Sequence, residues 1–183
     1  MYTIGIYMDP LEQVDFTKDS TVSIIYSLKN KADVKLIHCD SLIYDSSNTF
    51  GEISDLEIIS LAKGEYVLTK SRKINLNKLD CILFRKDPPV DNKYISDLQM
   101  FRELQYQKTL VLNSPESLIR FNEKILGCML SDTKLPTIVS SNKKSLNIAK
   151  KLFSDGRVHH VVKNDYRDKS KIDRLIKNII KSK

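Results

Sequence analysis

Four short, continuous apolar segments place the strongest limit on the fold of this chain. They span residues 2–8, 34–38, 80–84 and 109–112, and they are rich in β-branched and aromatic side chains. A strand with apolar residues on both faces is typical of a parallel sheet that helices cover on its two sides. The four segments therefore predict a buried, mostly parallel sheet with flanking helices.

Helical patterns alternate with these strands. Asp19 and Ser20 are N-cap residue types, and they precede an apolar stripe of helical spacing. Further helices are predicted over about residues 93–107 and from Pro115, which follows the cap residue Ser114. The alternation of strand and helix predicts an α/β fold, with a right-handed crossover between the first two parallel strands.

The remaining segments are less regular. Two strand-like segments lie on either side of Lys63-Gly64, and they predict either a hairpin or an extended excursion of the chain. A chain of 183 residues is long enough for one complete domain and part of a second. We expect a first domain over residues 1–120, the start of another domain over 121–163, and a basic amphipathic tail helix over 164–183. The apolar face of that helix would consist of Ile172, Leu175, Ile176, Ile179 and Ile180.

The net charge of +7 lies in the last part of the chain. Residues 1–140 hold 17 Lys and Arg against 19 Asp and Glu, whereas residues 141–183 hold 13 against 4. A basic tail can contact nucleic acid or an anionic membrane. However, no nucleic-acid motif accompanies it, and residues 169–183 contain no Trp or Phe that could stack or insert. We therefore expect neither partner.

The composition also argues against a secreted or metal-binding protein. Cys39, Cys81 and Cys128 are odd in number and widely spaced, which predicts free thiols. His159 and His160 would point to opposite sides of a strand, and no further metal ligand lies near them in the sequence. No apolar segment reaches the roughly 18 residues of a membrane span, and no basic residues precede the first apolar segment as in a signal peptide. We therefore expect a cytoplasmic chain with no metal site of its own.

Two sets of charged residues stand where α/β proteins bind anions. Lys18 precedes a predicted helix start, whose free amides attract carboxylates and phosphates, although ordinary helix capping explains this segment more simply. Arg85 and Lys86 follow a predicted buried strand, at the carboxyl end where open sheets place their ligands. A guanidinium can bind a carboxylate through two hydrogen bonds, which suits an amino acid or a peptide. For Arg85 and Lys86, a binding role and a structural role are equally supported by these residues alone.

Five short motifs follow one another along the front of the chain. They are Met8-Asp9-Pro10, Lys18-Asp19-Ser20, Arg85-Lys86-Asp87-Pro88-Pro89, Asn113-Ser114-Pro115-Glu116-Ser117-Leu118 and Asn122-Glu123-Lys124. In this order and at this spacing, they resemble the prokaryotic glutathione synthetase family over about residues 1–145. Members of that family have an α/β N-terminal domain followed by an ATP-grasp domain. They join γ-glutamylcysteine to glycine with ATP and magnesium, through an acyl phosphate.

The resemblance implies two sets of binding residues. The dipeptide would be bound by Lys18, Asp19, Ser20 and Arg85. The nucleotide would be contacted by Lys124 and Lys163, and residues 121–163 would be the beginning of the ATP-grasp domain. The resemblance implies no catalytic residue and no magnesium ligand within this sequence.

The sequence departs from the family pattern after Lys163. The family continues with proline and a glycine-rich loop over the phosphates, whereas this chain continues with Asn164-Asp165-Tyr166-Arg167. A loop that wraps phosphates with its amides needs glycine for close approach, and the only glycine after Gly127 is Gly156. We therefore expect a truncated, inactive front part of a synthetase.

Other interpretations stay open. The chain could be the substrate-binding half of a split ligase, completed by a second chain with the remaining ATP-grasp elements, or a non-catalytic binding module; it could also form a homo-oligomer. The regular spacing of the tail isoleucines argues against an accidental ending. A nucleic-acid or membrane-surface binder is the interpretation with the least support.

Overall fold

The structure is a computed structural model that describes residues 1–107, 109–121, 125–126 and 130. The chain divides into two units, and the described residues up to Leu126 all belong to the first, Met1–Leu126. Most of the predicted ATP-grasp segment and the whole predicted tail helix therefore lie outside the described residues. Every helix among the described residues is too short or too polar to cross a lipid bilayer.

Four parallel strands form the centre of the sheet, as the sequence predicts. They are β1 (Tyr2–Tyr7), β2 (Ala32–Ile37), β7 (Cys81–Phe84) and β8 (Leu110–Leu112). Their order is β2-β1-β7-β8, so β1 pairs with β2 on one side and with β7 on the other. The α/β fold class with its parallel sheet and flanking helices is thereby confirmed.

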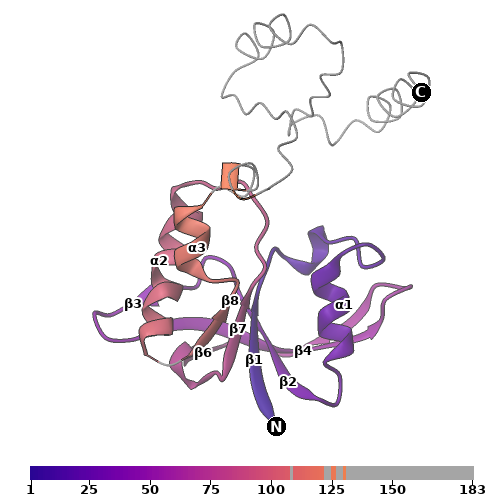
Figure 1. Ribbon diagram of the computed structural model, residues 1–183. Coiled ribbons are helices and arrows are strands. Elements are labelled where there is room, and N and C mark those ends of the chain that lie inside the picture. Colours follow the sequence, from indigo (N-terminus) through magenta and orange to yellow (C-terminus); the bar gives the residue numbers. More distant parts are fainter. Residues whose placement is uncertain (108, 122–124, 127–129, 131–183) are drawn as a thin grey trace, which may run out of the picture. The chain divides into compact units, whose positions relative to one another are not determined.

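Three helices pack against this sheet. Helix α1 (Ser20–Ser27) lies on one side, and α2 (Asn92–Tyr106) and α3 (Pro115–Arg120) lie together on the other (Figure 1). The side chains of Asp19, Asp91 and Ser114 cap them by accepting hydrogen bonds from backbone amides of the first turn. The predicted helix starts are therefore confirmed. Two short 3-10 helices, Leu11–Gln13 and Leu76–Lys78, precede α1 and β7.

The long strand β4 (Thr49–Ser60) adds an antiparallel part to the sheet. It pairs with β2, β3 (Ile43–Tyr44), β5 (Glu65–Leu68) and β6 (Arg72–Asn75). The predicted hairpin is the β4–β5 pair. Gly64 in its turn has a φ of +65°, a conformation that glycine adopts without steric cost.

Each face of the sheet carries its own buried apolar group, because successive side chains of a strand point to opposite sides. Ile6 faces α1 and Tyr7 faces α2. The group on the α1 side includes Ile6, Met8, Leu11, Val22, Ile25, Val34, Leu36, Leu56 and Ile58. The group on the α2 side includes Tyr7, Ile37, Ile53, Leu76, Ile82, Phe84, Leu98, Phe101, Leu104 and Val111. Together they hold β1 and β7 in the middle of the sheet of the first unit, and so fix where the loops that follow these strands begin.

Candidate functional site

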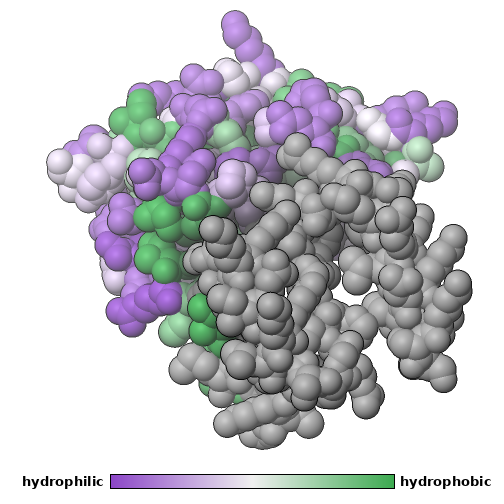
Figure 2. Space-filling model, turned by 90° about the horizontal axis from the view of Figure 1, so that it is seen from above, coloured by the Kyte–Doolittle hydropathy of each residue, from purple (hydrophilic) through white to green (hydrophobic). Residues whose placement is uncertain are grey.

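The order of the strands marks the carboxyl ends of β1 and β7 as a binding position. From β1 the chain passes through α1 to β2 on one side, and β7 later takes the place on the other side of β1. In open α/β sheets, ligands bind where the strand order reverses in this way, outside the carboxyl ends of the strands. Figure 2 views the molecule from above, and the described surface that it leaves visible is largely hydrophilic, with smaller hydrophobic areas between.

Arg85 directly follows β7 at this point. Its backbone amide donates to the carbonyl oxygen of Tyr7 at 2.7 Å, which continues the pairing of β7 with β1. Its side chain reaches the first turn of α1, where Nε donates to Thr21 Oγ1 at 3.1 Å and Nη2 donates to Ser20 Oγ at 2.8 Å. The structure therefore brings together two of the predicted site residues, Ser20 and Arg85, which lie far apart in the sequence.

Arg85 differs from the other arginines of the described residues. The described residues include four arginines, and the three besides Arg85 each have a carboxylate partner. Arg72 pairs with Asp55, Arg102 with Glu103 and Glu116, and Arg120 with Glu116. Among the described residues, Arg85 has hydroxyl partners only. Hydroxyl groups orient a guanidinium without neutralising its charge. A dipeptide contact of Arg85 stays a prediction.

The start of α1 is held by Asp19. Its Oδ1 accepts hydrogen bonds from the amides of Thr21 at 2.7 Å and Val22 at 2.9 Å. As the N-cap, the carboxylate of Asp19 is hydrogen-bonded to the first turn of α1. The cap also fixes this turn, so that the hydroxyl groups of Ser20 and Thr21 lie beside Arg85. A ligand contact of Asp19 stays a prediction.

Lys18 lies two residues before Ser20 but contacts a different residue. Its Nζ donates to Asp15 Oδ2 at 2.6 Å, and the side chains of both residues are well exposed. The hydrogen bond from Lys18, together with those from Thr17, lowers the pKa of Asp15 to about 2. Because water competes with exposed ion pairs, Lys18 can leave Asp15 for another anion at little cost. A dipeptide contact of Lys18 stays a prediction.

Lys86, the second cation after β7, is engaged by Asp9. Lys86 Nζ lies 2.5 Å from Asp9 Oδ1, and the Asp87 amide donates to Asp9 Oδ2 at 2.9 Å. Burial has the largest single effect on Lys86 and lowers its pKa, but the hydrogen bond to Asp9 and the charges of Cys39 and Asp9 together outweigh it, so the pKa of the ammonium group is raised. The loops after β1 and after β7 are thereby joined directly.

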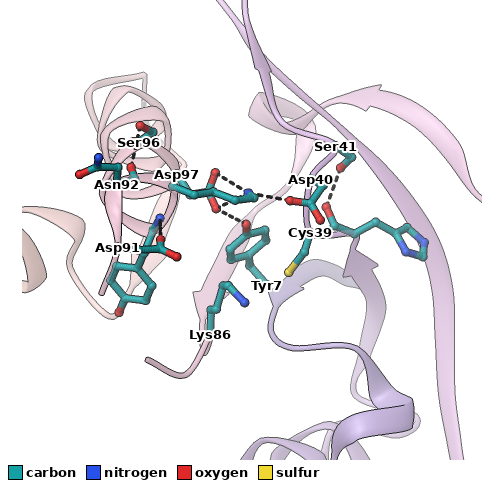
Figure 3. Close-up of polar contacts among 12 residues, drawn as sticks. Tyr7, Cys39, Asp40, Ser41, Lys86, Asp91, Asn92, Ser96 and Asp97 are labelled. Atoms are coloured by element: carbon teal, nitrogen blue, oxygen red, sulfur yellow. Dashed lines mark hydrogen bonds and ion pairs between the residues drawn. The ribbon is translucent and has the colours of Figure 1, made fainter. Parts of the chain in front are cut away.

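A second polar network lies on the α2 side of β1 (Figure 3). The Tyr7 hydroxyl donates to Asp97 Oδ2 at 2.5 Å, and Lys93 Nζ lies 2.9 Å from the same oxygen. Lys93 also reaches Asp40, in the loop after β2, at 3.1 Å. Tyr7 and Asp97 are buried, so the network ties the beginning of α2 to the ends of β1 and β2 from inside the protein.

Cys39 lies between these two networks. Its Sγ donates to the Met8 carbonyl oxygen at 3.2 Å, and burial raises the pKa of the thiol. Cys39 and Met8 line a cavity of about 170 Å³ at this edge of the sheet, together with Asp9, His38 and Asp40. A protonated, half-buried thiol is a poor nucleophile, so we assign Cys39 no chemical role.

A larger cavity lies at the opposite ends of the strands. It measures about 390 Å³ and lies between the end of α1 and strands β4 and β5. Its charged residues already pair within the protein: Lys29 with Glu57 at 2.9 Å, and Asp55 with Lys35 and Arg72. The candidate site therefore lies where the strand order reverses and where Arg85 lacks a carboxylate partner among the described residues, and not at the cavity of larger volume.

Several residues of this edge were not predicted from the sequence. Asp9, Tyr7, Lys93 and Asp97 form its polar contacts. Asp9 stood in one of the five motifs without a role, and Asp97 left a signal as a carboxylate on the apolar face of α2. Within the described part of the chain, no three His, Cys, Asp or Glu side chains lie together as metal ligands would. The predicted nucleotide residues Lys124 and Lys163 lie outside the described residues.

Comparison with known proteins agrees with the motifs. The model of the prokaryotic glutathione synthetase N-terminal domain matches residues 2–119. Among curated relatives, glutathione synthetases from Vibrio vulnificus (strain YJ016) and Citrobacter rodentium are 26% and 28% identical over 156 residues, which is 85% of this chain. Another, from Buchnera aphidicola subsp. Acyrthosiphon pisum, is 29% identical over 140 residues, or 76% of this chain.

These matches cover 49%, 50% and 44% of the three relatives. The chain thus spans about half the length of the curated relatives it matches. The family match, in contrast, includes every described strand and each of the four residues predicted to bind the dipeptide. The chain therefore belongs to the prokaryotic glutathione synthetase family, through its N-terminal domain.

Proposed function

We propose that this chain provides the γ-glutamylcysteine side of a glutathione synthetase site, with Arg85 as the residue that binds a carboxylate of the dipeptide. The observation that carries the proposal is the guanidinium at the strand-order reversal, held by Ser20 and Thr21 but neutralised by no carboxylate of the described residues. Relatives of the chain are named glutathione synthetase, which supports the choice of ligand.

The chemistry of Arg85 suits this ligand. γ-Glutamylcysteine carries two carboxylates, and a guanidinium offers parallel N–H donors that match the two oxygens of one carboxylate. Arg85 is partly buried, so water screens the resulting ion pair less than it would on an open surface. Lys18 would contribute a second, exchangeable cation, and the Asp19 cap would keep the start of α1 in place.

The nucleotide side of the reaction is proposed for the later part of the chain. ATP with magnesium would supply a phosphoryl group to a dipeptide carboxylate, and the amine of glycine would displace phosphate from the acyl phosphate. We assign contacts with the nucleotide to Lys124 and Lys163. Glutathione formation by a ligase of the ATP-grasp type, in the cytoplasm, is the reaction to whose dipeptide site we relate this chain; the chain alone would bind the dipeptide without completing the reaction.

A binding measurement tests the role of Arg85. Isothermal titration of the purified chain with γ-glutamylcysteine should show binding, and Arg85→Met should weaken it about tenfold or more, because a bidentate charged contact is lost. Arg72→Met is the matched control, since Arg72 lies on β6 and its partner Asp55 keeps Lys35. Equal affinities of the original chain and Arg85→Met would contradict the proposal.

An activity measurement tests whether the chain binds the dipeptide without completing the synthesis of glutathione. A polypeptide of residues 1–183 should bind the dipeptide but make no glutathione from γ-glutamylcysteine, glycine and Mg-ATP, because no glycine follows Lys163 to form a phosphate loop. Turnover near the roughly 10 per second of a typical enzyme would contradict this expectation. Activity that appears only with a second chain from the same source would favour the split-ligase alternative.

A further inference from the structure

Asp9 uses both carboxylate oxygens to hold the segment that follows Arg85. Oδ1 takes the Lys86 ammonium group at 2.5 Å, and Oδ2 takes the Asp87 amide at 2.9 Å. Asp9 itself lies two residues after β1 and 77 residues away from Lys86 in the sequence. One side chain therefore fixes the loop after β7 to the loop after β1.

The segment has few other ways to be fixed. Pro88 and Pro89 follow Asp87, and neither has a backbone N–H, so the Asp87 amide is the last backbone donor of the turn before Val90. Before this turn, the backbone amide of Arg85 donates to the carbonyl oxygen of Tyr7 and so holds Arg85 to β1. The direction in which the chain leaves β7 therefore depends on the two bonds to Asp9.

The burial of the pair makes these bonds effective. The side chains of Lys86 and Asp9 are 19% and 28% exposed, whereas those of Lys18 and Asp15 are 75% and 50% exposed. Charged hydrogen bonds that are shielded from water are stronger and position their partners more firmly than exposed ones. Since the ammonium group of Lys86 is turned to Asp9, Arg85 remains the cation of this segment that can take a ligand.

We propose that Asp9 is a positioning residue: its carboxylate holds the turn after β7 so that the guanidinium of Arg85 meets Ser20 and Thr21 and faces a ligand carboxylate. Lys86 serves the same purpose, as the partner of Asp9 rather than of the ligand. This inference rests on the proposed function, in which Arg85 binds γ-glutamylcysteine.

The first test is a double-mutant cycle in dipeptide affinity. Asp9→Asn can still accept from the Asp87 amide but loses the ion pair, and it should weaken γ-glutamylcysteine binding about tenfold. If Asp9 acts through Arg85, adding Asp9→Asn to Arg85→Met should cause less than about a twofold further loss. A full tenfold loss in both backgrounds would overturn the proposal, because Asp9 would then act independently of Arg85.

The control is Asp45→Asn. Asp45 also accepts backbone amides in a loop, from Ser47 at 3.1 Å and Asn48 at 2.8 Å, but it lies outside the candidate site. This variant should leave the affinity unchanged. If Asp9→Asn fails to fold, Lys86→Met replaces it in the cycle, because that change breaks the same ion pair and leaves the bond from the Asp87 amide intact.

The second test needs no ligand. The Nε–H signal of Arg85 in a nitrogen–proton NMR spectrum, assigned by its loss in Arg85→Lys, reports the hydrogen bond to Thr21. In Asp9→Asn or Lys86→Met this signal should move towards the position of solvent-exposed arginines, and in Asp45→Asn it should stay. An unmoved signal would overturn the positioning role. Absence of dipeptide binding by the unchanged chain together with a moved signal would refute the proposed ligand and still support the positioning role.

Discussion

Replacement of Tyr7 by phenylalanine isolates the contribution of one buried hydrogen bond. Tyr7 is fully buried, and its hydroxyl donates to Asp97 at 2.5 Å. Phenylalanine keeps the ring and its contacts with Phe84 and Phe101, whose centroids lie 5.3 and 4.9 Å away. The substitution thus removes a hydroxyl without opening a cavity the size of a side chain.

The expected loss follows from what remains around Asp97. A hydrogen bond to a charged group contributes about 1.5–3 kcal/mol. Lys93 still contacts both oxygens of Asp97, at 2.9 and 3.2 Å, so the carboxylate keeps a partner in the variant. Phenylalanine also avoids the cost of burying a hydroxyl, about 1–3 kcal/mol in proteins. We therefore expect Tyr7→Phe to lower the free energy of unfolding by about 1 kcal/mol near neutral pH.

The dependence on pH gives a second, independent check. Burial, and then the hydrogen bond to Asp97, raises the pKa of Tyr7 well above its ordinary value. The folded state therefore retains the phenolic proton at a pH where the unfolded state releases it. The stabilisation is complete below the unfolded pKa of about 10 and decreases as the pH rises above it. The difference between the two proteins should accordingly shrink above that pH.

Urea unfolding, followed by circular dichroism at several pH values, measures both effects. The slope against urea should be the same in the two proteins, so that the midpoints report stability. Tyr106→Phe is the control, because Tyr106 is 73% exposed and its hydroxyl is not buried. A Tyr7→Phe protein as stable as the original, or a difference that grows above about pH 10, would refute the reasoning.

Two further predictions concern other parts of the sheet. Hydrogen bonds from Arg72 and then Lys35 lower the pKa of Asp55, so Asp55→Asn should cost about 1 kcal/mol near neutral pH after solvent screening, and less as the pH falls below about 4. Acid and neutral urea titrations of both proteins check this sign, and a loss that grows in acid would contradict it. Gly64→Ala should cost about 1 kcal/mol because of the positive φ, and an unchanged thermal midpoint would contradict that expectation.

The sequence predicts the parallel centre of the fold well, because strands covered on both faces need continuous apolar residues. The first two residues of β2, Ala32 and Asp33, were not predicted as part of the strand. They pair with Tyr2 and Thr3 at the amino-terminal ends of β1 and β2, where the strand residues need not be apolar. The pairing of β4 with four other strands depends on register over long distances, which no local pattern encodes.

In the candidate site, too, the sequence predicts local features but not the contacts between distant residues. Arg85 was predictable, because its place after a buried strand is a local feature. Its contacts with Ser20 and Thr21, and those of Lys86 with Asp9, join residues more than 60 positions apart, and side-chain geometry decides them. A sequence shows that a cation is present at such a place; the packing shows which cation is already neutralised.

Strand β4 also bears on how the domain comes apart. Its Ile53 belongs to the apolar group on the α2 side, whereas Leu56 and Ile58 belong to the group on the α1 side. Detachment of β4 would expose both groups at once, so neither layer of helices has a core that survives alone. Hydrogen exchange of the amides in α1 and α2 should therefore report one shared opening event, and the edge that holds Arg85 should persist or vanish as a whole.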